Sequence, residues 1–201
     1  MTKLKLCGMM TEQDAAFCNQ VQPDLVGIVF APGRKRTVTP ETAARIRRVL
    51  DRSIPAVGVF IDAQLSEITA LADRRIIDFA QLHGSEDNAY ISELRKRSNL
   101  LIIKAFRVQS EADILNAERS DADIVLLDGG AGEGKAFDWS HLRDFRRPFF
   151  LAGGLDPVRV KDVIARYAPY GVDVSSGIET DGRKDPEKMQ AFVNAVRSAG
   201  A

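Results

Sequence analysis

Residues 24–50 read DLVGIVFAPGRKRTVTPETAARIRRVL and contain one complete strand–loop–helix unit. After its first residue the run Asp24–Phe30 does not alternate with polar side chains, as expected for a strand buried on both faces. Thr39-Pro40-Glu41 predicts the start of a helix, because the threonine hydroxyl can cap the first turn and proline fits its first position. Similar units of about 25 residues fill the chain from end to end.

Seven further apolar runs are predicted to be strands, and they are Lys3–Cys7, Pro55–Ile61, Ile77–Leu82, Leu100–Phe106, Asp123–Asp128, Phe149–Ala152 and Gly171–Val174. Strands that alternate with helices predict a parallel sheet, either open and doubly wound or closed into a barrel. Eight nearly equal units favour closure, and the turn Cys7-Gly8-Met9-Met10 lacks the G-x-G-x-x-G pattern of many open sheets. We therefore predict the α/β class and a single-domain (β/α)8 TIM barrel over residues 1–201.

Further helix starts are predicted at three places. Asp156-Pro157 and Asp185-Pro186 repeat the cap-and-proline pattern, and the segment that begins at Ser110 resembles a capping box. The sixth helix, near Ser140–Phe145, is expected to be very short.

Composition and charge limit the possible partners. Apolar residues make up 45% of the chain, and the formal net charge is zero. A nucleic-acid-binding surface concentrates positive charge, whereas the densest basic stretch here, Arg34–Arg36, suits a small anion. We therefore expect a small-molecule substrate and no nucleic acid. No apolar run is long enough to cross a bilayer, so we also expect no membrane association.

The N-terminus has no apolar signal region. The two cysteines, Cys7 and Cys18, form no C-x-x-C pair, so we expect reduced thiols and a cytoplasmic location. The sequence leaves monomer and homodimer equally open.

In a TIM barrel the active site lies at the carboxyl ends of the strands. Candidate residues are therefore the polar or glycine residues at which an apolar run stops. They are Cys7, Arg34, Arg36, Asp62, Gln81, His83, Lys104, Arg107, Asp128, Gly153, Gly154, Asp173, Ser175 and Ser176. No cluster has the spacing of metal ligands, so we predict no metal.

The last two strands end in a predicted phosphate site. Leu151-Ala-Gly-Gly-Leu155 places Gly153 and Gly154 where backbone N–H groups can approach a ligand. Val174-Ser-Ser-Gly-Ile178 can open a short helix whose N–H groups, at Ser175, Ser176 and Gly177, point at an anion. The loops after strands 7 and 8 are the usual phosphate site of this fold. The alternative is a pair of tight turns with hydroxyl caps.

Cys7 and Asp128 are the candidate acid–base groups. A buried cysteine is often an inert core residue, but a thiol at the barrel mouth can act as a base if positive charge lowers its pKa. Asp128 closes an apolar run, and partial burial is expected to raise its pKa so that it can serve as an acid. The following segment Gly129–Gly134 is expected to be either a lid or a solvated connection.

Several segments together resemble the phosphoribosylanthranilate isomerase family of tryptophan biosynthesis. They appear in the order typical of that family over essentially the whole chain, and they are Lys5-Leu-Cys-Gly8, Asp14-Ala15, Gly27-Ile-Val-Phe30, Lys35-Arg36, Val57-Gly-Val-Phe60, Gln81-Leu-His-Gly84, Leu126-Leu-Asp128, Gly132–Trp139, Ala152-Gly-Gly-Leu155 and Asp173–Glu179.

The resemblance implies a barrel without cofactor or metal that performs an Amadori rearrangement of N-(5-phosphoribosyl)anthranilate. It implies that Asp128 protonates the ribose ring oxygen, that Cys7 removes the C2 proton, and that Arg36 faces the anthranilate carboxylate. Gly154, Ser175, Ser176 and Gly177 would hold the phosphate, and we expect Gln81, His83 and Asp173 to contact the substrate as well.

Three positions depart from the family pattern. Met9-Met10 replaces the usual Ile-Thr, Arg34-Lys35-Arg36-Thr37 replaces Ser-x-Arg-Tyr, and Gly129 replaces an Asn or Thr. One alternative is therefore a paralogous isomerase of another amino-sugar phosphate, with Arg34 as its adaptation. A binding protein without turnover would not need both Cys7 and Asp128, and a thiol redox protein would need a second cysteine near Cys7.

Overall fold

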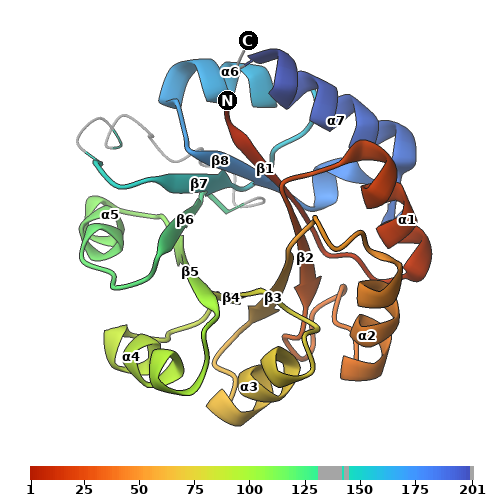
Figure 1. The fold of residues 1–201 in the computed structure, drawn as a ribbon. Coiled ribbons are helices and arrows are strands. Elements are labelled where there is room, and N and C mark those ends of the chain that lie inside the picture. Colours follow the sequence, from red (N-terminus) through yellow and green to blue (C-terminus); the bar gives the residue numbers. More distant parts are fainter. Residues whose placement is uncertain (131–141, 143–144, 200–201) are drawn as a thin grey trace.

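The computed structural model describes residues 1–130, 142 and 145–199, and its central feature is a closed parallel barrel. Each strand pairs with the next along the chain, and β8 pairs with β1 (Figure 1). The barrel strands are β1 (Lys3–Cys7), β2 (Leu25–Val29), β3 (Ala56–Phe60), β4 (Phe79–Leu82), β5 (Leu101–Arg107), β6 (Ile124–Asp128), β7 (Phe149–Ala152) and β8 (Gly171–Val174). The predicted (β/α)8 barrel is confirmed, with strand ends within two residues of the expected ones.

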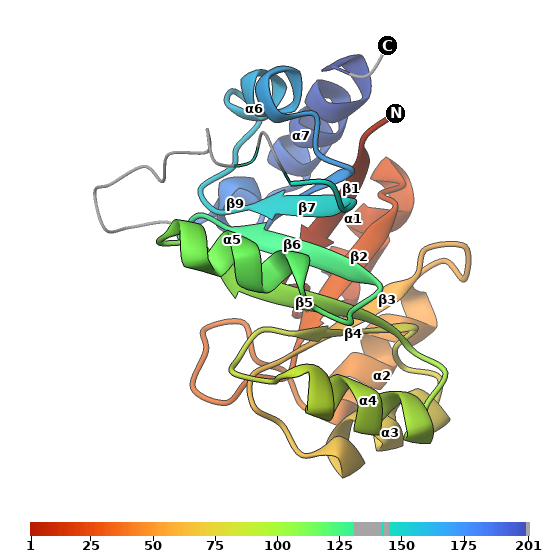
Figure 2. The ribbon, with the colours of Figure 1, turned by 90° about the vertical axis from the view of Figure 1, so that its left-hand side faces the viewer.

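Helices surround the barrel on its outside (Figures 1 and 2). They are α1 (Glu12–Val21), α2 (Pro40–Val49), α3 (Leu65–Asp73), α4 (Asn88–Arg97), α5 (Glu111–Glu118), α6 (Val160–Tyr167) and α7 (Pro186–Ala199). A 3-10 turn, η2 (Ser176–Ile178), and a two-stranded ribbon of β9 (Glu179–Thr180) and β10 (Arg183–Lys184) lie between β8 and α7.

No helix in the described part of the chain is both long and apolar enough to span a membrane. Most of the predicted short helix near Ser140–Phe145, most of the segment Gly129–Gly134, and the family segment Gly132–Trp139 lie outside the described residues.

The predicted helix caps are present at the starts of α2 and α7. The Thr39 hydroxyl accepts a hydrogen bond from the N–H of Thr42 at 3.2 Å, and the Asp185 carboxylate accepts one from the N–H of Glu187 at 2.9 Å. At α5, the Ser110 N–H donates to Asp113 at 2.9 Å, as in a capping box.

The expected start of α6 is wrong by a few residues. Asp156 accepts hydrogen bonds from the N–H groups of Val158 and Arg159, at 2.9 and 2.8 Å, but these residues form a turn. The helix begins only at Val160. The same cap-and-proline pattern therefore starts a helix directly at Asp185 but an intervening turn at Asp156.

Two apolar clusters form the core. The larger one lies between strands and helices, and the smaller one fills the barrel interior with Leu25, Val57, Ile103, Ala105, Leu126, Phe150 and Ala152. Because side chains alternate along a strand, the next inward position toward the carboxyl end lies two residues further on. This parity points Cys7, Asp128 and Asp173 into the mouth of the barrel.

Gly171 has a packing role in the barrel interior. It is paired with Phe150 across β7 and β8, and a Cβ atom at Gly171 would lie 2.4 Å from Cε1 of the Phe150 ring. We predict that Gly171→Ala lowers the free energy of unfolding by roughly 1–3 kcal/mol, because the added methyl group overpacks the interior. Urea denaturation measures this change. Phe150→Leu in the Gly171→Ala background should recover part of this loss. If the double variant instead loses as much stability as the two single variants together, the contact with Phe150 is not the cause.

Candidate functional site

A cavity of about 520 Å³ opens at the carboxyl ends of the strands. Most of the predicted site residues line it, and they are Cys7, Arg34, Arg36, Gln81, His83, Arg107, Asp128, Gly153, Gly154, Asp173, Ser175 and Ser176, whereas Gly177 does not. Two other polar residues at strand ends do not line it. Asp62 accepts hydrogen bonds from Ser85 on the rim, and Lys104 forms a buried ion pair with Glu86 at 3.0 Å.

The loops after β7 and β8 contact each other closely at the cavity edge. Gly153 and Gly154 both have positive φ, at 103° and 63°, which favours glycine. A Cβ atom at Gly177 would lie 1.9 Å from the carbonyl oxygen of Leu155, so only glycine fits there without a backbone shift. The Ser175 hydroxyl donates to the carbonyl of Cys7 at 3.1 Å, which ties this loop to the end of β1.

Cys7 ends β1 and is almost fully buried, with 8% of its surface exposed toward the cavity. Burial raises the pKa of its thiol, while the positive charges of Lys5 and Lys184 act against burial. Positive charge does lower this pKa, as the role of a base requires, but removal from water has the larger effect. A raised pKa makes the Cys7 thiolate a stronger base, but it lowers the fraction of the thiol that is ionised at neutral pH.

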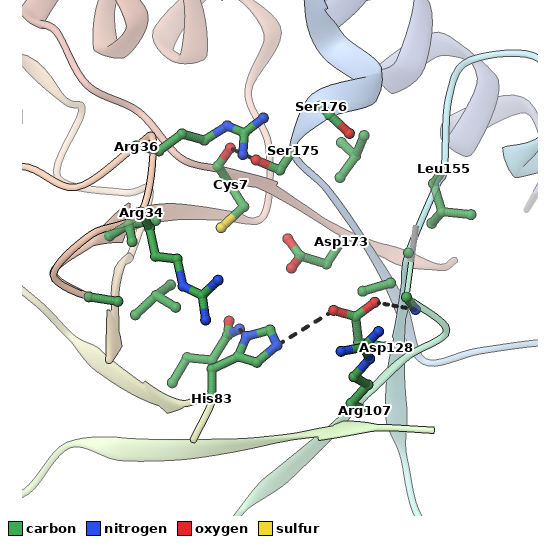
Figure 3. A pocket seen from close by; sticks show the side chains of 18 of the residues that line it. Cys7, Arg34, Arg36, His83, Arg107, Asp128, Leu155, Asp173, Ser175 and Ser176 are labelled. Atoms are coloured by element: carbon green, nitrogen blue, oxygen red, sulfur yellow. Dashed lines mark hydrogen bonds and ion pairs between the residues drawn. The ribbon is translucent and has the colours of Figure 1, made fainter. Parts of the chain in front are cut away.

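Asp128 ends β6 and interacts with His83, whose Nε2 lies 3.5 Å from Oδ2 of the carboxylate (Figure 3). Burial acts to raise the pKa of Asp128, but the hydrogen bonds from His83 and from the Gly130 N–H, with the charge of Arg107, hold it below its usual value. The expected raised pKa is therefore wrong for this state of the protein, because hydrogen bonds to the ionised form outweigh partial burial.

Gln81 fixes the orientation of His83. Its Nε2 lies 3.1 Å from Nδ1 of His83. With the amide in this orientation, Nδ1 accepts the hydrogen bond from Gln81, and Nε2 of the ring faces Asp128 as a donor. The buried Oε1 of Gln81 has no hydrogen-bond partner among the described residues.

Arg36 lines the cavity, but part of its guanidinium is already engaged. Nε and Nη2 donate to the two carboxylate oxygens of Glu179, each at 2.6 Å. Glu179 also accepts a hydrogen bond from Lys184 at 2.6 Å. Gly8 provides the space for this arrangement, because a Cβ atom there would lie 2.4 Å from Cδ of Arg36. One edge of the Arg36 guanidinium, with Nε and Nη2, therefore binds Glu179.

Glu179 is a polar residue of the site that was not predicted. It lies 143 positions from Arg36 in the sequence, and no spacing rule connects the two. The adjacent Arg34 is exposed, and its side chain points into the cavity toward His83 (Figure 3). Arg34 is therefore available to a ligand at this side of the site.

The cavity has a thiol on one side and a carboxylate on another. Cys7 and Asp128 approach from separate strands, and Asp173 lies between them (Figure 3). Such an arrangement can move protons at two atoms of one ligand. Among the described residues, no group of three or more His, Cys, Asp or Glu side chains is arranged to hold a metal ion.

Comparison with known proteins identifies close relatives along the whole chain. Residues 4–195 match the family model of N-(5′-phosphoribosyl)anthranilate isomerase. The isomerase of that name from Endomicrobium trichonymphae is 42% identical over 203 residues, which cover 98% of this chain and 100% of the relative.

Solved structures of phosphoribosylanthranilate isomerases are similar to this chain in both sequence and fold. A phosphoribosylanthranilate isomerase in complex with reduced 1-(o-carboxyphenylamino)-1-deoxyribulose 5-phosphate is 35% identical, with a TM-score of 0.88 over 98% of this chain and 100% of that chain. Engineered monomers of the dimeric Thermotoga maritima enzyme are 33% identical, with a TM-score of 0.87 and the same coverage.

The Glu179 carboxylate is expected to stabilise the fold only while it is ionised. Burial acts to raise its pKa, but Arg36 and Lys184 hold that pKa below its usual value. The stabilisation is therefore present above the unfolded-state pKa of about 4.3 and is lost as the pH falls through the folded-state pKa. We predict that Glu179→Gln lowers the free energy of unfolding at pH 7 by roughly 3 kcal/mol, because the buried Lys184 and the partly buried Arg36 lose their anionic partner.

Urea denaturation at a series of pH values from 7 downward measures this difference. It should narrow at the acid end of the series, where the wild-type carboxylate becomes protonated. The exposed Glu67 provides a control, since Glu67→Gln should change stability little at any pH. A difference for Glu179→Gln that stays constant with pH would contradict the role of its charge.

Proposed function

The chain belongs to the N-(5′-phosphoribosyl)anthranilate isomerase family and is an isomerase of tryptophan biosynthesis, and we propose that Cys7 and Asp128 perform its acid–base chemistry. The observation that carries this proposal is that the two side chains line one cavity from separate strands, β1 and β6. The reaction needs an acid at one substrate atom and a base at another, and these two groups provide both.

The first step opens the ribose ring. Asp128 donates a proton to the ring oxygen, the C1–O bond breaks, and the nitrogen lone pair forms a C1=N iminium. The ring oxygen is a poor leaving group without this proton, so the step requires an acid. A correctly placed general acid contributes about 10²–10⁴-fold to the rate.

The second step removes the C2 proton. The iminium makes this proton acidic, so the Cys7 thiolate can take it and the electron pair moves into a C1=C2 double bond. The resulting enaminol gains a proton at C1 and releases the proton of its C2 hydroxyl. The product is the 1-(2-carboxyphenylamino)-1-deoxyribulose 5-phosphate, with a ketone at C2.

Substrate binding favours the protonated form of Asp128. Burial acts to raise the pKa of Asp128, but His83, the Gly130 N–H and Arg107 hold it below its usual value. A substrate that carries a phosphate and a carboxylate adds negative charge to the same cavity, which favours the protonated acid. The Nε2–H of His83 faces Asp128, so the imidazole orients the carboxyl group for proton transfer.

The phosphate end of the substrate is assigned to the loops after β7 and β8. Gly153, Gly154, Ser175 and Ser176 line the cavity, and Gly177 keeps the two loops in contact. Backbone N–H groups at the start of a helical turn favour an anion. This assignment agrees with the usual phosphate site of the fold.

The remaining polar groups fit the middle of the substrate and its anthranilate end. Asp173 lies between the acid and the base, and Oε1 of Gln81, which has no partner among the described residues, can accept a hydrogen bond from a substrate donor. At the anthranilate end, Arg34 adds a second positive charge beside Arg36. We assign the anthranilate carboxylate to Arg34 together with the Arg36 hydrogens that Glu179 does not occupy.

The proposal includes a cytoplasmic site of action. Both Cys7 and Cys18 are free thiols in the structure. Cys7 can serve as a base only while it is reduced, and the cytoplasm keeps thiols reduced.

The direct test is to mix the protein with freshly made phosphoribosylanthranilate and follow the loss of its fluorescence. We predict that Cys7→Ala and Asp128→Asn each lower kcat by about 10²–10⁴-fold while the fold survives, because each loses one proton transfer. Cys18→Ala is the matched control and should retain activity, since Cys18 is fully buried outside the cavity. A Cys7→Ala protein that keeps most of its activity would remove the proposed base.

The same assay separates the alternative substrate. Wild-type protein that causes no loss above the spontaneous decay would favour a paralogue acting on another amino-sugar phosphate. The barrel and the cavity would be unaffected by that result, and the replacement substrate would be sought among phosphorylated amino sugars.

Substitutions of Arg34 and Arg36 are both predicted to weaken substrate binding, but only that of Arg36 is predicted to lower stability. Arg34→Ala should raise KM by about tenfold or more with a smaller effect on kcat, since a hydrogen bond to a charged group is worth about 1.5–3 kcal/mol. Arg36→Ala should also raise KM, and it should lower stability because Glu179 loses its partner. Steady-state kinetics measures both, and Lys35→Ala is the neighbouring control, since Lys35 does not line the cavity. An unchanged KM for Arg34→Ala would assign the carboxylate to Arg36 alone.

A further inference from the structure

Lys5 is a charged residue inside the barrel. It lies on β1 two positions before Cys7, is completely buried, and its Nζ is 3.0 Å from Oδ1 of Asp173. Although burial disfavours its charge, Asp173 and Cys7 hold the pKa of Lys5 above its usual value, so that it is an ammonium ion. Neither its length nor its charge is needed to fill the apolar interior.

Stability does not explain this ion pair. Removing two charges from water costs several kcal/mol for each ion, and apolar residues of similar volume are often as stabilising or more so. Apolar residues are found at this depth elsewhere in the barrel, because Val57 on β3 and Ile103 on β5 also point into the interior there. The pair Lys5–Asp173 therefore has an electrostatic role.

The ammonium group of Lys5 lies close to the sulfur of Cys7. The two atoms flank the space that a side chain at Gly27 would occupy, because a Cβ atom there would be 2.6 Å from Sγ and 3.1 Å from Nζ. Glycine on β2 therefore leaves no side chain between the charge and the thiol.

The charged groups that face Cys7 come from four elements. Lys5 lies on β1, Asp173 on β8, Lys184 on β10 and Arg36 in the loop after β2. Lys184 is engaged by Glu179 and by the Ser175 carbonyl, at 2.6 and 2.9 Å, and Arg36 is engaged by Glu179. Lys5 is the cation that shares its buried environment with both Cys7 and the substrate-facing Asp173.

We propose that Lys5 is a positioning residue of the reaction, which stabilises the Cys7 thiolate and holds the Asp173 carboxylate in place between base and acid. The proposal deepens the assignment of Cys7 as the base and rests on it for its catalytic consequence. Its electrostatic part can be tested without substrate. A buried positive charge next to a sulfur that must be anionic offsets part of the cost of removing that anion from water.

The first experiment titrates the Cys7 thiol by its rate of alkylation with iodoacetamide as a function of pH. Cys18→Ala provides a single-thiol background, and burial already raises the pKa of Cys18 to about 12. In that background, Lys5→Met should move the midpoint of the alkylation profile up by about 1 unit or more. Lys5→Gln, which is also uncharged but can still donate to Asp173, should do the same, and Lys5→Arg should keep most of the wild-type midpoint.

Lys104 provides the matched control. It is also a buried barrel lysine in an ion pair of 3.0 Å, with Glu86, but it does not line the cavity. Lys104→Met should lower stability and leave the Cys7 midpoint unchanged. An unchanged midpoint in both uncharged Lys5 variants would overturn the proposal, and so would an equal shift in Lys104→Met.

The second experiment measures kcat and KM across pH. In Lys5→Met the acid limb of kcat/KM should move to higher pH with the alkylation midpoint, and kcat should recover in part as the pH rises. Lys5→Arg should restore the wild-type limb. If Lys5→Arg restores the alkylation midpoint but not the rate, the effect of the charge on the thiol stands and Cys7 is removed as the base. The two ideas therefore fail separately.

Discussion

Closure of the parallel barrel is the constraint on which the site depends. Every barrel strand runs in the same direction and is hydrogen-bonded on both sides, so all eight carboxyl ends meet at one rim. Along each barrel strand, side chains that point into the barrel alternate with side chains that point outward. Cys7 and Asp128 are 121 positions apart in the sequence, yet each is the last inward residue of its strand, and this alone brings both into the same cavity.

This constraint explains how much could be predicted from the sequence. The continuous apolar runs gave the strands, and the residue at which each run stops gave the cavity lining, because strand direction and parity are simple consequences of the fold. The double glycine Gly153-Gly154 was informative for a different reason. Its positive φ angles belong to a turn that other residues rarely adopt, so its backbone conformation can be anticipated from the residue type.

Properties that depend on distant side chains could not be predicted. Asp128 was expected to have a raised pKa from burial alone, whereas His83, directly after β4, lowers it. Arg36 was expected to face the anthranilate carboxylate, but its two hydrogen bonds to Glu179 were not anticipated. Both omissions have one origin. Burial follows from position within a strand, but a hydrogen-bond partner follows from the relative placement of two elements, which residue types do not specify.

The barrel interior divides into two environments along its axis. Toward the amino ends it is apolar, with Leu25, Phe79 and Ile124, and toward the carboxyl ends it carries Asp173, Cys7 and Asp128. The apolar half excludes water from beneath the charges, so that each ion pair acts at low dielectric and strongly affects its neighbours. Lys5 and Asp173 lie at the boundary between the two halves. The closed barrel therefore provides a fixed electrostatic environment for proton transfer, because the charges are held by packed strands and need little reorganisation when a substrate binds.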